Sequence, residues 1–160
     1  MNNEKDNVYD LVEDFYAHDE GWNTLLRQEY AEGFLRMEAW KGKKNSDLYR
    51  SWDNLTMLCL YLGSAETFLG DMNADDFIDC MAWCGRNISE FTPDYKNTQD
   101  FLETCDGLFK YLKGKNAISN DTVPGTAAEI LLQEGKMNII LPDGSFDEAN
   151  AERAWNATPD

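Results

Sequence analysis

Apolar residues recur every three or four positions along most of the chain, which is the spacing of one buried face of an α-helix. The first such stripe predicts a helix over residues 6–18, and Gly21 is expected to end it. The second stripe predicts one long helix over 22–40. The polar stretch 41–45 that follows contains a glycine, three lysines and an asparagine, which is typical of a helix end. We therefore expect the N-terminal part of the chain to be a pair of helices.

Three further amphipathic helices are predicted between residues 46 and 114. Their expected spans are 46–62, 73–87 and 92–114. Their expected N-cap residues are Ser46, Asn73 and Thr92. Such side chains can accept a hydrogen bond from a free N–H group of the first turn. Pro93 suits the first helical position, and Gly63 and Gly114 are expected to end their helices. A short helical piece is expected at 65–69.

The last part of the chain has a different character. Residues 119–125 combine serine, asparagine, proline and glycine, a composition typical of a linker. Residues 126–129 have the pattern of a capping box before a short helix, and residues 145–148 repeat that pattern before a last helix. Residues 137–144 are expected to form a small hairpin or an extended arm. We therefore expect an all-α helical bundle with a small C-terminal helix and hairpin piece.

Thirty acidic side chains outnumber fourteen basic ones, and the formal net charge of the 160-residue chain is −16. Such a charge repels nucleic-acid backbones and anionic membranes, so neither is an expected partner. The aromatic content of 12% exceeds that of disordered acidic tails, so the charge must coat a folded body. His18 is the single histidine, which leaves little of the side chain that most acid–base and metal chemistry uses. We expect it to be solvated at a helix end.

Two features favour the cytosol. Residues 1–6 have neither the basic nor the apolar segment of a signal peptide, and no stretch approaches the ~20 apolar residues of a membrane helix. A reducing compartment would also leave the four cysteines as small, free, apolar side chains.

The segment that begins at Asp71 imitates part of a calcium-binding loop. Asp71, Asn73 and Asp75 match the first three ligand positions of an EF-hand. The glycine needed for the sharp turn is replaced by Asp76, and the bidentate glutamate is replaced by Ala82. We therefore interpret these acids as partners of a helix dipole rather than as calcium ligands.

Cys80 and Cys84 lie four residues apart on one predicted helix and therefore face the same way. With Cys59 and Cys105 on neighbouring helices, they could hold zinc as four thiolates. Structural zinc sites favour loops with ligands about two to four residues apart, whereas these cysteines lie in apolar helical stretches. Thiols that pack in the core are the preferred interpretation. Because phosphate-binding loops and nucleophile motifs are also missing from the sequence, we expect no catalytic residue, metal or cofactor.

The only basic run of the sequence consists of Lys41, Lys43, Lys44 and Arg50. These four residues could contact a nucleic-acid phosphate backbone. The alternative is a solvated loop and helix end, and the surrounding acidic field opposes an anionic partner.

Aromatic residues repeat at helical spacing at Trp22, Tyr30, Phe34 and Trp40. Core packing explains this stripe most simply. An exposed member of it would instead mark an interface with another molecule.

Three segments carry a family resemblance: a helix that ends in YLG at 61–63, the segment FLGDMNADDFIDCMAWC, and the segment TPDYKNTQDFLETCDGLFKYLKGKNAI. On these segments, residues 46–118 resemble the N-terminal core-binding domain of tyrosine recombinases (phage integrases). The resemblance implies a SAM-like four-helix bundle. It divides the chain into an N-terminal helical pair (1–45), the bundle (46–118), and a linker with the C-terminal piece (119–160).

The sequence departs from the recombinases in two respects. Their catalytic domain needs a His-x-x-Arg motif and a nucleophilic tyrosine, and residues 119–160 are too few to supply such a domain. Their bundle also grips DNA through a basic face, whereas residues 51–100 contain nine acidic and only two basic side chains. Because phosphate neutralisation supplies most non-specific DNA affinity, the main driving force for DNA binding is missing.

We therefore expect a non-enzymatic, cytosolic helical protein that acts through protein–protein interaction or self-association. One alternative is a nucleic-acid-binding accessory protein that uses the basic run, and another is an acidic DNA mimic that occupies the basic cleft of a partner. An enzyme that uses clustered carboxylates has the least support. A pocket that holds two or more carboxylates with perturbed pKa values would favour it.

Overall fold

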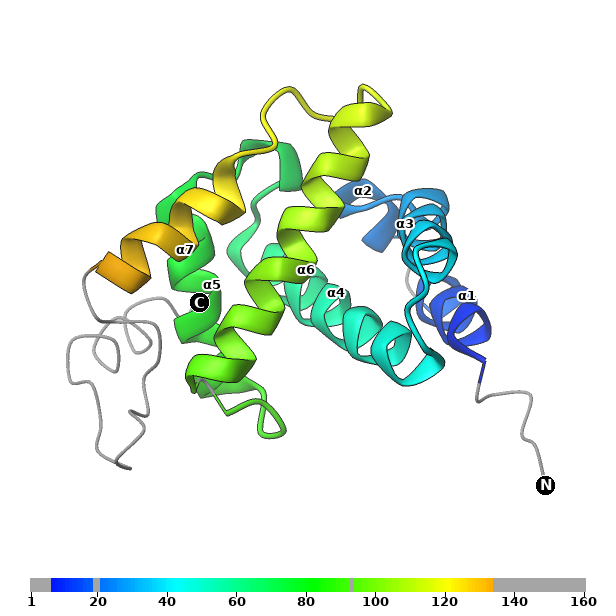
Figure 1. The fold of residues 1–160 in the computed structure, drawn as a ribbon, viewed down its shortest axis with the longest axis horizontal. Helices are drawn as coiled ribbons and strands as arrows, with labels where there is room; N and C mark the ends of the chain where they lie inside the picture. Colours follow the sequence, from blue (N-terminus) through cyan, green and yellow to red (C-terminus); the bar gives the residue numbers. More distant parts are fainter. Residues whose placement is uncertain (1–6, 19–20, 93, 134–160) are drawn as a thin grey trace.

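The computed structural model describes residues 7–18, 21–92 and 94–133 (Figure 1). Within these ranges the chain is helical and contains no strand, which confirms the predicted all-α class. The helices in chain order are α1 (Val8–His18), α2 (Trp22–Leu25), α3 (Gln28–Trp40), α4 (Asn45–Ala65), the 3-10 turn η2 (Leu69–Asp71), α5 (Ala74–Asn87), α6 (Tyr95–Gly114) and α7 (Val123–Gln133). The hairpin predicted at 137–144 and the helix predicted from 145 lie outside the described residues.

The two longest helices, α4 and α6, occupy the middle of the molecule. Helices α1, α2 and α3 pack on one side of α4, and α5 and α7 pack on the other side, with α7 against both α5 and α6 (Figure 1). One continuous apolar core joins the two sides. Its largest fully buried side chains include Phe34, Phe77, Phe101 and Phe109. Burial of each such side chain contributes roughly 1.5–3 kcal/mol.

The predicted long helix over 22–40 is wrong, because the chain breaks into α2 and α3. Leu26 is extended, with φ −151° and ψ 118°, and its side chain is only 3% exposed. Arg27 is extended as well, and the Asn23 side chain then accepts a hydrogen bond from the Gln28 N–H at 3.0 Å. The break therefore inserts Leu26 into the core, and Asn23 satisfies a free N–H at the start of α3.

The start of α5 follows the prediction, and the start of α6 does not. Asn73 caps α5 in a capping box, in which its side chain accepts from the Asp76 N–H and the Asp76 carboxylate accepts from the Asn73 N–H, both at 2.9 Å. At α6 the cap is Asp94, which accepts from the Asn97 N–H at 2.8 Å. The prediction of Thr92 as the N-cap of α6 is wrong, because Thr92 lies two residues before Asp94.

Helix α4 is longer than predicted at its C-terminal end. Ser46 lies inside its first turn and does not cap it, because Lys44 occupies the N-cap position without a side-chain bond. Gly63 does not end the helix either. It lies under Trp22, and a Cβ atom at Gly63 would come within 3.1 Å of the Trp22 ring. The helix ends instead at Glu66, whose φ of 54° is left-handed and whose N–H donates to the Leu62 carbonyl.

The region after α6 also differs from the prediction. Helix α7 begins within the expected linker, with Pro124 in its first turn. Thr126 is therefore inside the helix rather than at its cap, and its hydroxyl donates to the Thr122 carbonyl at 3.0 Å. Ala127 and Leu131 are buried against the bundle. Between α4 and α5, the short helical piece predicted at 65–69 is displaced to η2.

Candidate functional site

A cleft of about 420 Å³ opens between α4, the segment that connects α5 to α6, and the first turns of α6. Helix α5 ends at Ile88, which turns away with φ −110° and ψ 104°. The Phe91 N–H then donates to the Ile88 carbonyl at 3.0 Å and closes a turn beside α4. Phe91 is nearly buried. This turn forms one wall of the cleft, and the α4 residues from Arg50 to Leu60 form the opposite wall.

Part of the cleft lining is apolar. The apolar lining consists of Met57, Leu60, Ile88 and Phe91. Leu60 is among the few large hydrophobic side chains of the described residues that are exposed to solvent. An apolar surface that remains open to water inside a concave site is a typical feature of a binding site.

The walls of the cleft carry an excess of negative charge. Asp53, Glu90 and Asp100 contribute three carboxylates and Arg50 one guanidinium, so the formal charge of the lining is 1 − 3 = −2. Partial burial raises the pKa of Asp53, and the nearby Glu90 carboxylate raises it further. A cation placed between these two carboxylates would relieve their repulsion.

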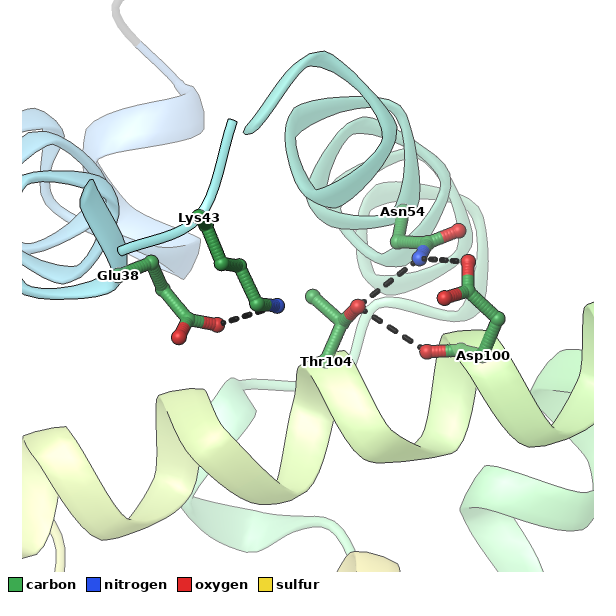
Figure 2. Close-up of polar contacts among 5 residues, drawn as sticks. All are labelled: Glu38, Lys43, Asn54, Asp100 and Thr104. Carbon is green, nitrogen blue, oxygen red and sulfur yellow. Dashed lines mark hydrogen bonds and ion pairs between the residues drawn. The ribbon is translucent and has the colours of Figure 1, made fainter. Parts of the chain in front are cut away.

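Asp100 is held in place by a buried polar contact between α4 and α6 (Figure 2). Asn54, only 5% exposed, donates from Nδ2 to Asp100 Oδ2 at 3.1 Å and to Thr104 Oγ1 at 2.9 Å. The Thr104 hydroxyl in turn donates to the Asp100 carbonyl at 3.0 Å. We call these three residues the polar crossing. Because each member bonds the others, the carboxylate of Asp100 is fixed at the cleft without a ligand.

The structure separates the four basic residues of the predicted run. Lys41, Lys43 and Lys44 are exposed on the turn between α3 and α4. Lys43 forms an ion pair with Glu38 at 3.0 Å (Figure 2), and Glu38 is only 9% exposed. Arg50 lies apart from this turn and lines the acidic cleft. The run is thus divided between a lysine-bearing turn and an acidic site.

The aromatic stripe is also divided. Phe34 is fully buried, as core packing predicts, whereas Trp40 at the end of α3 is 91% exposed. Trp40 directly precedes the three lysines. We call Trp40, Lys41, Lys43 and Lys44 the basic corner. An exposed member of the aromatic stripe is the feature expected to mark an interface with another molecule.

All four cysteines are free and fully buried, which confirms their prediction as core thiols. The sulfur atoms of Cys80 and Cys84 are 4.0 Å apart, and Cys105 interacts electrostatically with both Cys84 and Cys59. We call these four residues the thiol core. Burial raises the pKa of Cys59 to about 12, and it raises the pKa values of Cys80 and Cys105 as well. No group of three or more metal-ligating side chains was found among the described residues.

The remaining predicted positions have local structural roles. Asn73 and Asp76 bond each other's backbone in the capping box, and Asp71 ends η2. His18 is exposed at the last residue of α1, as predicted.

Sequence reasoning missed the cleft, although one signal was present. Asp53 and Asn54 lie three and four residues after Arg50, and Met57 lies four and three residues after them, so the four residues share one face of α4. That face mixes charged, amide and apolar side chains, which an ordinary solvated face or core face does not. Glu90 and Asp100 could not be added from spacing alone, because the turn after α5 brings Glu90 to the cleft and the packing of α6 on α4 brings Asp100 there.

Comparison of the sequence with protein-family models and with curated proteins, and of the fold with solved structures, found no match. Among the described residues, no helix is both long and apolar enough to cross a membrane. The function must therefore be inferred from the geometry of the cleft and the basic corner.

Proposed function

We propose that this chain is a non-enzymatic protein-interaction module whose α4–α6 cleft binds a cationic, partly apolar segment of a protein. The observation that carries the proposal is the combination of an apolar lining with three carboxylates in one open cleft. We also propose that the protein works in the cytosol, which agrees with its four free thiols.

The chemistry of the cleft suits a lysine or arginine side chain together with an apolar neighbour. Lysine and arginine have an apolar stem and a charged head, so the stem can lie on Met57 and Leu60 while the head meets Asp53 and Glu90. A phosphate-bearing ligand is disfavoured at the same place, because three carboxylates would repel it. The whole-chain charge of −16 would also accelerate the encounter with a cationic partner.

The site needs little rearrangement before it binds. The polar crossing holds the Asp100 carboxylate through Asn54 and Thr104, and Phe91 is already packed. A preorganised site loses less conformational entropy on binding than a site that must be ordered by its ligand.

One observation favours a second candidate, an enzyme that uses clustered carboxylates. Burial raises the pKa of Asp53 and the Glu90 carboxylate raises it further, and glycoside hydrolases use a carboxyl group with a raised pKa as their general acid. Turnover of a panel of nitrophenyl glycosides that is abolished in an Asp53→Asn variant would support this candidate. No turnover above buffer would eliminate glycoside hydrolysis.

The binding function can be tested with the capped tripeptide Ac-Lys-Trp-Lys-NH2 as a probe. We expect its addition to the full chain to shift the backbone amide NMR signals of Asp53, Leu60 and Phe91, with a dissociation constant on the order of 1 mM or tighter. An Asp53→Asn/Glu90→Gln variant should lose these shifts.

A matched control removes two carboxylates that do not line the cleft. The variant Glu13→Gln/Asp14→Asn changes the net charge equally on an exposed part of α1 and should keep the shifts. Equal loss in both variants would mean that the tripeptide responds only to net charge. Shifts that avoid the cleft in the unmodified chain would refute the proposed site.

A further inference from the structure

The basic corner presents a large apolar side chain to solvent. Trp40 is 91% exposed, and tryptophan is one of the residue types most enriched among the residues that dominate binding energy at interfaces. Lys41 and Lys44 follow it on the same turn and are exposed as well. Lys43 is already neutralised by Glu38, so Lys41 and Lys44 are the charges that the corner offers to a partner.

The turn that carries the corner is held by several bonds. The Lys41 N–H donates to the Met37 carbonyl at 3.0 Å, and the Lys43 N–H donates to the Glu38 carbonyl at 3.2 Å. Gly42 has a φ of 98°, which an L side chain rarely adopts. Because the turn is ordered before any contact, little conformational entropy is lost when it docks.

The corner and the cleft have opposite properties. The corner carries one exposed aromatic ring and two lysines outside the Glu38 ion pair, and the cleft lining combines apolar side chains with carboxylates. We propose that the basic corner of one copy of this chain docks into the α4–α6 cleft of a second copy, and that the second copy returns the same contact. This inference rests on the proposed function and names the occupant of its cleft.

The position of the two patches favours a closed two-fold pair. The turn that carries the corner leads into α4, which begins at Asn45 (Figure 1). The cleft is lined by residues from Arg50 to Leu60 on the same helix. Two patches along one helix can face their counterparts on a second copy at the same time. A two-fold axis satisfies this condition, because the basic corner of each copy then meets the cleft of the other copy.

The charge of the whole chain makes this association depend on salt in a specific way. Two copies of charge −16 repel each other at long range, whereas the lysine–carboxylate contacts are short. At ~0.15 M salt the screening length is ~8 Å, so distant repulsion is weakened more than the direct contacts. We expect self-association to be strongest at intermediate salt and weaker at both extremes.

The test is a charge exchange followed by sedimentation velocity of the full chain at up to ~1 mM, where even millimolar dissociation constants are visible. The Lys41→Glu/Lys44→Glu variant and the Asp53→Lys/Glu90→Lys variant should each associate at least about tenfold more weakly than the unmodified chain. Mixed together, the two variants should form a heterodimer, because both corner–cleft contacts are then attractive.

Two further variants separate the contact from folding and from net charge. Trp40→Ala removes the exposed ring without touching the core and should weaken association at least about tenfold. Lys110→Glu/Lys115→Glu changes the net charge as much as the corner variant does, at an exposed residue of α6 and at the exposed residue that follows it, and should weaken association much less. Variants that lose their helical circular dichroism signal are replaced by Lys41→Gln/Lys44→Gln and Asp53→Asn/Glu90→Gln.

The outcomes distinguish this inference from the function on which it rests. An unmodified chain that stays monomeric at ~1 mM overturns the second copy as occupant. If the chain is monomeric and the Lys-Trp-Lys tripeptide still shifts the cleft signals of the Trp40→Ala variant, the occupant of the cleft is a segment of another protein. A mixture of the two charge-exchanged variants that remains monomeric also overturns the inference. Loss of the tripeptide shifts overturns the proposed function itself.

Discussion

Helices α4 and α6 meet in two regions that differ in chemistry. In the polar crossing, Asn54 bonds Asp100 and Thr104 beside an open cleft. In the thiol core, Cys59 of α4 and Cys105 of α6 are fully buried with the two cysteines of α5. Thiols need few hydrogen bonds and can fill a dry interior, whereas amide and hydroxyl groups must be paired. The difference shows that this bundle separates its stabilising interior from a preorganised polar region near solvent.

The largest expected effect is a loss of folding stability at alkaline pH, which arises in the thiol core. Burial raises the pKa of Cys59 from 9.0 to about 12. Below pH 9 both states keep the proton and the stability is complete. Between pH 9 and 12 the unfolded chain releases this proton while the folded chain keeps it, so the free energy of unfolding falls as pH rises. For three pH units the loss is about 4 kcal/mol from Cys59 alone.

Urea unfolding at pH 8, 9, 10 and 11 measures this loss. Tyr16 and Tyr61, whose pKa values burial also raises, add to the fall in the unmodified chain. The Cys59→Ala variant should therefore be less stable at pH 8 but lose stability less steeply, by up to about 1.4 kcal/mol per pH unit. Parallel curves for the two proteins would contradict the prediction.

Removing one member of the polar crossing should have the next largest effect. Asn54→Ala leaves Thr104 and Asp100 without their shared donor and should lower the free energy of unfolding by about 2–4 kcal/mol. The double variant Asn54→Leu/Thr104→Val makes the crossing apolar, as the thiol core is. It should lose less than the single variant, because fewer buried polar groups are left unpaired.

Denaturant unfolding of the two variants measures these losses in the free energy of unfolding. Gln99 is exposed, so the Gln99→Ala variant is the control and should stay within about 0.5 kcal/mol of the unmodified chain. The single variant should also bind the tripeptide more weakly, since Asp100 is no longer held. Equal losses in the single and double variants would show that shape, not hydrogen bonding, stabilises the crossing.

Lys43 should matter for folding and Lys41 for association. Lys43→Ala leaves the nearly buried Glu38 carboxylate without its partner and should lower the free energy of unfolding by about 1–2 kcal/mol. Lys41 is exposed, so Lys41→Ala should change stability by less than about 0.5 kcal/mol. Thermal unfolding and sedimentation of the same two variants should give opposite rankings. The same ranking in both measurements would argue against separate roles.

Much of the fold was predictable from local signals. The apolar stripes located most of the helices, and the Asn73 cap was identified correctly because all of its partners lie within three residues. Errors arose where a distant contact decides. The break at Leu26 exists because the core accepts that side chain, and Gly63 stays helical beneath Trp22. No pattern within α2 or α4 contains that information.

The candidate site was predictable to a smaller extent. The spacing of Arg50, Asp53 and Asn54 places them on one face of α4. Their proximity to Glu90 depends on the turn after α5, and their proximity to Asp100 depends on the packing of α6 on α4. The exposure of Trp40 was open for the same reason, because a stripe at helical spacing does not reveal where the neighbouring helix ends. The resemblance of residues 46–118 to a recombinase core-binding domain stays a prediction.

The smallest expected effect is a gain in stability from a change beside the thiol core. The Tyr16 hydroxyl is buried and has no partner within hydrogen-bond geometry among the described residues, and the nearby Cys59 thiol is at most a weak partner because sulfur is a poor hydrogen-bonding group. Tyr16→Phe removes an unpaired polar group and should raise the free energy of unfolding by about 1 kcal/mol. The hydroxyl of Thr98 is unpaired in the same way, so Thr98→Val should also stabilise the fold. If Tyr16→Phe instead lowers the midpoint of urea unfolding, the Tyr16 hydroxyl has a partner in the folded chain. The surroundings of the thiol core are then more polar than the cysteines indicate.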